Sequence, residues 1–176
     1  MGQSHQKIVR VLVVGLSGMG KTHFLDMFNL GEDTIKMPTL GRYETSIRLE
    51  SSDTYIHLVE YGAQSVHAWL KYNRNEEEYH AIYLVVCSNA TPEQLCESKN
   101  LVCSIDMLSH LPLVVIYNVR GGGMSFEKRN KALQLGAMTG HRRVSAVDLK
   151  FDNSPTFANR VAKVFEWTRG VPTKIV

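Results

Sequence analysis

The chain has 176 residues, 44% of them hydrophobic and 21% charged, which is the composition of one folded domain with a sizeable core. Its 20 basic and 17 acidic residues leave a net charge of +3, which is too small to indicate nucleic-acid binding. No run of 18 apolar residues predicts a transmembrane helix. The three cysteines (Cys87, Cys96, Cys103) have no zinc-ligand or disulfide spacing, so we expect a reducing, cytoplasmic location.

The first third of the chain predicts a strand, a helix and a hairpin. Residues 8–14 are rich in β-branched side chains and indicate a strand. Apolar side chains recur at helical spacing from residue 21 to about residue 30. Residues 42–50 and 54–61 each alternate with period two across a short polar turn, which favours an antiparallel hairpin.

The remainder predicts buried strands alternating with helices. Residues 81–88 and 111–118 are continuous apolar runs, typical of strands covered on both faces, and residues 142–150 predict a last short strand. Helices are expected after three capping residues, Thr91, Ser125 (ending near Gly136) and Ser154. The sum is an α/β fold with a six-stranded, mostly parallel sheet, one antiparallel strand and helices on both faces. We expect one domain over residues 1–176, with its core at about 8–168.

The junction between the first strand and the first helix carries a phosphate-binding motif. The stretch "VLVVGLSGMGKT" (11–22) contains G-x-x-x-x-G-K-[ST] in the strand–loop–helix context that this motif requires. Backbone N–H groups of such a loop bind anions, Lys21 would reach the β- and γ-phosphates, and Thr22 would ligate Mg²⁺. The expected nucleotide-binding residues are Gly15, Ser17, Gly18, Met19, Gly20, Lys21 and Thr22. The sequence therefore predicts a P-loop domain.

Later segments extend the match in order and approximate spacing. They are "MPTLG" (37–41), "EYGAQ" (60–64), "VVCSN" (85–89), "YNVRG" (117–121) and "SAV" (145–147). With the phosphate loop, they resemble the Ras-like small GTPases, in particular the ADP-ribosylation-factor and Arf-like branch. The resemblance covers about residues 8 to 168 and implies GTP or GDP with Mg²⁺ as cofactors.

The resemblance implies roles for individual residues. Thr39 would be the switch I threonine, closing on Mg²⁺ and the γ-phosphate, and Gln64 would be the catalytic residue that orients the attacking water. Asn118 would tie the base-binding loop to the phosphate loop. Ser145 and Ala146 would contact the guanine from the last base-binding loop.

Four positions depart from the family pattern. Gly121 stands where an aspartate pairs with guanine, and Val119 where a lysine stem covers the base; alternation points the neighbouring Arg120 to the opposite side from Val119. Glu60 replaces the aspartate that holds Mg²⁺ through a water molecule, and Ala63 replaces a glycine whose N–H meets the γ-phosphate. We therefore expect phosphate binding to persist, base discrimination to weaken, and GTP hydrolysis to be slow or lost.

Three functions remain open on the sequence. The first is a nucleotide-dependent switch or adaptor in intracellular trafficking of a vesicle or ciliary type. Its effectors would bind the switch segments and the 43–60 hairpin, and an exchange factor and a GTPase-activating protein would act on it. The second is a pseudo-GTPase that serves as a structural or interaction subunit of a larger assembly. The third is an ATP-using P-loop enzyme. It has the least support, because the sequence shows no lid-like arginine cluster.

The N-terminus bears on membrane contact. The chain begins Met1-Gly2 but has Gln6 where myristoylation prefers Ser or Thr, so acylation of Gly2 stays open. The first strand begins near Ile8, which leaves no room for the amphipathic helix of Arf proteins. One myristoyl chain gives marginal, reversible binding, so at most weak peripheral membrane contact is expected.

Overall fold

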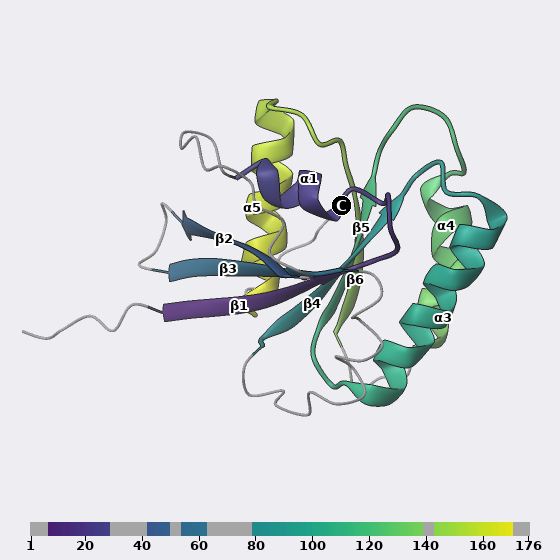
Figure 1. Ribbon diagram of the computed structural model, residues 1–176, viewed down its shortest axis with the longest axis horizontal. Helices are drawn as coiled ribbons and strands as arrows, with labels where there is room; N and C mark the ends of the chain where they lie inside the picture. The colour runs from purple at the N-terminus through teal and green to yellow at the C-terminus, as the bar shows by residue number, and fades with distance from the viewer. Residues whose placement is uncertain (1–6, 29–41, 50–53, 63–78, 139–142, 171–176) are drawn as a thin grey trace, which may run out of the picture.

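Six strands form one sheet, with the order β2-β3-β1-β4-β5-β6 (Figure 1). The computed structural model describes residues 7–28, 42–49, 54–62, 79–138 and 143–170. The strands are β1 (Lys7–Val14), β2 (Arg42–Leu49), β3 (Thr54–Tyr61), β4 (Ala81–Cys87), β5 (Leu113–Asn118) and β6 (Val144–Leu149). Every neighbouring pair is parallel except β2 with β3, which confirms the predicted sheet and its antiparallel hairpin.

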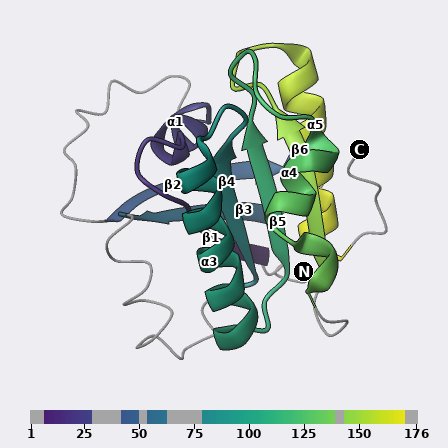
Figure 2. The ribbon, with the colours of Figure 1, turned by 90° about the vertical axis from the view of Figure 1, so that its right-hand side faces the viewer.

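Helices cover both faces of this sheet (Figures 1 and 2). They are α1 (Lys21–Asp26), α3 (Pro92–Leu108), α4 (Phe126–Ala132), α5 (Pro155–Thr168) and the short 3-10 helix η2 (Leu135–Ala137). Helices α1 and α5 pack on one face, and α3 and α4 on the other. Thr91, Ser125 and Ser154 cap α3, α4 and α5 through their side chains, as the sequence predicts, because each accepts a backbone N–H of the first turn.

The period-two geometry of the central strands divides the core into two layers. On β1, Val11 and Val13 pack toward α1 and α5, while Leu12 and Val14 pack toward α3 and α4. Strands β4 and β5 are buried at every position, which explains their unbroken apolar sequences.

Two predicted helix ends are wrong. Helix α1 ends at Asp26, with Met27 as its C-cap, and not at about residue 30. The helix that begins after Ser125 ends at Ala132, not near Gly136. Gln134 adopts a left-handed conformation with φ of 55°, which stops the α-helix, and the next residues form η2. Among the described helices, none combines the length and apolar character that a bilayer crossing requires.

A buried hydrogen-bond chain joins the sheet to the last helix. The Tyr83 and Thr168 hydroxyl oxygens lie 2.6 Å apart, and Thr168 donates to the Val164 carbonyl at 2.8 Å. Since the threonine proton is committed to that carbonyl, Tyr83 is the donor to Thr168. Tyr83 is fully buried, and burial raises the pKa of its phenol.

We expect Thr168→Val to lower the free energy of unfolding by about 1–3 kcal/mol, because the buried Tyr83 donor loses its partner. Tyr83→Phe should cost less, since Thr168 keeps its bond to Val164. The double variant should recover part of the Thr168→Val loss. Denaturant unfolding of the four proteins measures this, and strictly additive losses would contradict the proposed donor order.

Candidate functional site

The turn between β1 and α1 lies at the carboxyl edge of the sheet, where open α/β folds place ligands. It contains the predicted Gly15, Ser17 and Gly18 and ends at Gly20. A Cβ on Gly20 would lie 2.4 Å from Asn118 Nδ2, and its φ is 96°, so this position requires glycine. The chain thus passes close under β5 before α1 begins.

Met19 connects the turn to the ends of β4 and β5. Its side chain is buried, and its Sδ accepts the Cys87 backbone N–H at 3.2 Å. Its carbonyl oxygen accepts Asn118 Nδ2 at 3.1 Å. The ends of β4 and β5 therefore hold the loop at one residue, and the Asn118 contact is the one expected from the sequence.

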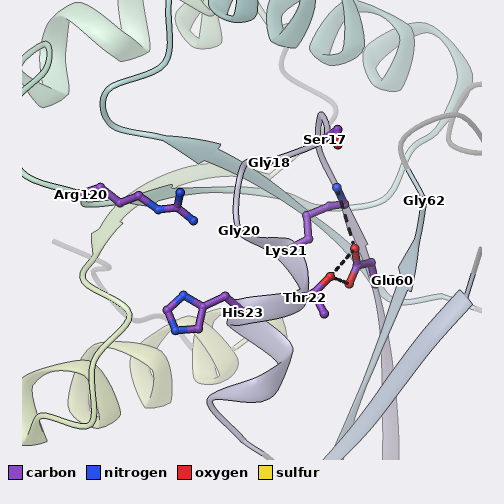
Figure 3. Close-up of a pocket in the computed structure, with 9 residues that line it drawn as sticks. All are labelled: Ser17, Gly18, Gly20, Lys21, Thr22, His23, Glu60, Gly62 and Arg120. Carbon is purple, nitrogen blue, oxygen red and sulfur yellow. Dashed lines mark hydrogen bonds and ion pairs between the residues drawn. The ribbon is translucent and has the colours of Figure 1, made fainter. Parts of the chain in front are cut away.

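A pocket of about 480 Å³ opens above this loop (Figure 3). Its lining residues are Ser17, Gly18, Gly20, Lys21, Thr22, His23, Glu60, Gly62 and Arg120. Figure 3 shows two ends, with Glu60, Thr22 and Gly62 on one side of the loop and Arg120 and His23 on the other. The volume lies within the range of small-molecule sites.

At the first end, three polar side chains converge. The Thr22 hydroxyl lies 3.1 and 2.9 Å from the two Glu60 carboxylate oxygens, to which it donates. Lys21 Nζ donates to the Leu16 carbonyl at 3.0 Å and lies 3.9 Å from Glu60 Oε1. Burial lowers the pKa of Lys21, although the negative charge of Glu60 acts in the opposite direction and raises it. Burial also raises the pKa of Glu60, against the Thr22 hydrogen bond and the Lys21 charge.

These groups fit a polyphosphate with Mg²⁺. Mg²⁺ prefers oxygen ligands and retains several waters, and Thr22 and Glu60 offer a hydroxyl and a carboxylate side by side. Lys21 is buried yet bonded to a neutral carbonyl, so phosphate oxygens would give its ammonium a stronger partner. Within the described ranges, no three His, Cys, Asp or Glu side chains converge to form an alternative metal site.

The second end contains Arg120 and His23, which are not among the site residues predicted from the sequence. Arg120 follows β5 and lies on the same side as Asn118, so its guanidinium reaches the loop, with Nη2 3.0 Å from a Cβ placed on Gly20. Val119 donates its backbone N–H to Leu149 and does not line the pocket. The alternation argument correctly separates the two side chains, but Arg120 is the one that faces the site.

The expected base contacts at Ser145 and Ala146 need correction. Both lie within β6, paired with Val114 and Val115, and not in the loop after the strand. Strand β6 continues to Leu149, beside Asn118, before it reaches the pocket edge. The predicted strand over residues 142–150 already contains Ser145 and Ala146, so the short motif match, and not the strand prediction, put the base-binding loop too early.

Of the residues that follow β6, Phe151 contacts a residue that lines the pocket. The Phe151 ring lies edge-to-face with His23 at 5.7 Å, which connects this loop to the second end of the pocket. At Gly121, where guanine-selective proteins of the resembled family have aspartate, no heavy atom lies within 4 Å of an added Cβ. The space is open, and the described lining residues supply no carboxylate there.

Three predicted site residues, Thr39, Ala63 and Gln64, lie outside the described residues. Their roles in closing on Mg²⁺, contacting the γ-phosphate and orienting water therefore stay predictions. Glu60 holding the metal through a water molecule is likewise still a prediction.

Comparison with known proteins gives a consistent result. A model of the ADP-ribosylation factor family matches residues 1–164. No curated protein sequence matches the chain. Among solved structures, the fold is similar to that of the Arl6 BBS3 small GTPase from Trypanosoma brucei, solved with the bound nucleotide analogue GppNp. The TM-score is 0.69 at 17% identity, over 93% of this chain and 96% of that chain, which shows a shared fold.

The buried carboxylate predicts a pH-dependent stability. Since the folded-state pKa of Glu60 lies above its ordinary value of 4.5, the stability that it contributes is complete below that value and is lost as the pH rises through the folded pKa. Glu60→Gln keeps an acceptor for Thr22 but removes the charge. Without nucleotide, the unfolding free energy of Glu60→Gln relative to that of the wild type should therefore increase as the pH rises from about 4.

Denaturant unfolding between about pH 4 and about pH 8 measures the difference. Glu97→Gln, on the exposed face of α3, controls for the loss of one negative charge. A constant gap between Glu60→Gln and the wild type across this window would contradict the burial argument.

Proposed function

Because the chain belongs to the ADP-ribosylation factor family, we propose that it binds GTP or GDP with Mg²⁺ in the pocket between β1 and α1 and acts as an Arf-like switch or adaptor in intracellular trafficking. The observation that carries the proposal is Lys21, a buried ammonium that lines a nucleotide-sized pocket and has a neutral carbonyl as its hydrogen-bond partner. A bound polyphosphate would neutralise this charge.

Each described group has a defined task in such a complex. The loop N–H groups and Lys21 would hold the phosphates, with Lys21 exchanging the Leu16 carbonyl for phosphate oxygens. Thr22 and Glu60 would hold Mg²⁺, the Glu60 carboxylate acting directly or through a water molecule. Mg²⁺, when bound, neutralises charge on the β- and γ-phosphate oxygens.

The proposed hydrolysis is slow. Gln64 would orient water, but small GTPases without an arginine finger turn over slowly, and Ala63 departs from the family pattern beside it. Mg²⁺ also requires tight octahedral geometry. Glu60 already reaches Thr22 directly, so a metal must displace an existing contact. Both features favour long residence in one nucleotide state.

The proposed partners bind the switch segments and the 43–60 hairpin. Strand β2 pairs with β3 alone in the described sheet, so its outer edge offers backbone groups to an effector. The face of this hairpin also carries a polar network in which His57 contacts both Ser46 and Glu44 at 2.8 Å. An exchange factor and a GTPase-activating protein would act at the same region. We place the protein in the cytoplasm, with weak peripheral membrane contact at most.

A pseudo-GTPase is the alternative. It is favoured by the open space at Gly121, where the guanine-selecting carboxylate is absent, together with the direct contact between Thr22 and Glu60. In that case a bound nucleotide would stabilise the fold by mass action without cycling, and the chain would serve as an interaction subunit.

The first test removes the lysine. Lys21→Ala should weaken binding of GTP or GDP with Mg²⁺ by roughly 10- to 100-fold, because a hydrogen bond to a charged group contributes about 1.5–3 kcal/mol. Isothermal titration calorimetry measures the affinities. Lys163→Ala, an exposed position of α5, is the charge-matched control. Equal affinities of Lys21→Ala and the wild type would refute the proposed site.

A second measurement separates a switch from a pseudo-GTPase. The purified protein is denatured and its released nucleotide is identified by chromatography, alongside a single-turnover hydrolysis assay. Released GDP with measurable turnover supports a cycling switch, whereas retained GTP with no turnover supports the alternative. Release of no nucleotide, combined with no calorimetric uptake, would rule out the switch and leave only a pseudo-GTPase that serves as an interaction subunit without a nucleotide.

A further inference from the structure

We propose that Arg120 binds the purine face and the adjoining phosphate at the second end of the pocket, and that this makes the site accept GTP and ATP with similar affinity. The inference rests on the proposed function, because it requires a nucleotide in this pocket. It assigns the weak base discrimination of the site to Arg120, which lies in the matched segment 117–121 at a position to which the resemblance gives no role.

The backbone around Arg120 directs its side chain to the loop. Arg120 follows Asn118 by two residues, so both side chains leave the β5 end on one side and approach Gly20. The Arg120 N–H donates to Ser88 Oγ at 3.0 Å. Gly123, three residues later, packs against the backbone of the same residue, Ser88: a Cβ added to Gly123 would lie 2.2 Å from the Ser88 carbonyl oxygen. The segment is therefore held on both sides of its arginine.

The guanidinium is available for a ligand. Within the described ranges it has no hydrogen-bond or ion-pair partner, and Arg120 is an exposed residue at the edge of the pocket. The carboxylate among the lining residues, Glu60, lies at the opposite end and is engaged with Thr22 and Lys21. His23 adds a ring at the same end as Arg120 and packs against Phe151.

The chemistry of arginine explains the expected lack of selectivity. A planar guanidinium stacks on aromatic faces and donates paired hydrogen bonds to phosphate oxygens. Neither interaction reads the hydrogen-bonding edge that distinguishes guanine from adenine. A bidentate contact to that edge contributes roughly 5- to 150-fold in affinity, and the open space at Gly121 lacks it.

The experiment compares binding of GTP and ATP, each with Mg²⁺, by calorimetry on the full chain. The wild type should bind both within tenfold, and Arg120→Ala should lose roughly tenfold for each to the same extent. Arg120→Lys retains the charge but not the planar group, so it should bind with an intermediate affinity. Lys163→Ala, at an exposed position of α5, is the charge-matched control and should bind as the wild type does.

Several outcomes would overturn the inference. They are a wild-type preference for GTP above 100-fold, a loss in Arg120→Ala confined to one nucleotide, or unchanged affinities in Arg120→Ala. In each of these cases the proposed function would still hold, provided that the wild type binds nucleotide and Lys21→Ala weakens that binding. Absence of uptake of either nucleotide by the wild type would overturn both. Thermal unfolding of each variant, measured alongside, establishes that the compared proteins are folded.

Discussion

The contact on which the site depends is the pair of hydrogen bonds made by Met19. Its carbonyl accepts the Asn118 amide and its sulfur accepts the Cys87 N–H, so one buried residue attaches the loop to two strands. Because Met19 is held below, the glycine positions on either side turn the loop backbone toward the pocket. Phosphate recognition by backbone N–H groups needs such a fixed curvature, since a loop free to relax would lose the convergence of its donors.

The polar side chains at the two ends of the pocket differ in whether they already have partners within the described residues. At one end, Thr22 donates to Glu60, while Lys21 donates to the Leu16 carbonyl and lies 3.9 Å from the Glu60 carboxylate. At the other end, Arg120 has no such partner within the described part of the chain. In the proposed complex, a ligand would rearrange existing contacts at the first end of the pocket and gain new ones at the second end, around Arg120. This asymmetry is consistent with the proposed combination of retained nucleotide binding and slow hydrolysis.

Much of the fold follows from local signals. The apolar sequences of β4 and β5, the capping side chains of Thr91 and Ser154, and the phosphate-loop spacing each have a physical cause that acts within a few residues. Arg120 was missed because its orientation depends on where β5 ends and on the Ser88 contact from another strand end. The base-loop assignment at Ser145 was wrong because a three-residue motif match does not show which residues pair in the sheet, and β6 pairs with β5 as far as Leu149.

The anchor of the phosphate loop comes from far along the chain. Asn118 lies 99 residues after Met19, and β4 and β5 must both join β1 before their ends can grip the loop. During synthesis, the complete glycine–lysine motif leaves the ribosome long before the strands that shape it. Binding of the proposed nucleotide would therefore be a late event in maturation, because the loop gains its Asn118 contact only after about two-thirds of the polypeptide has been made.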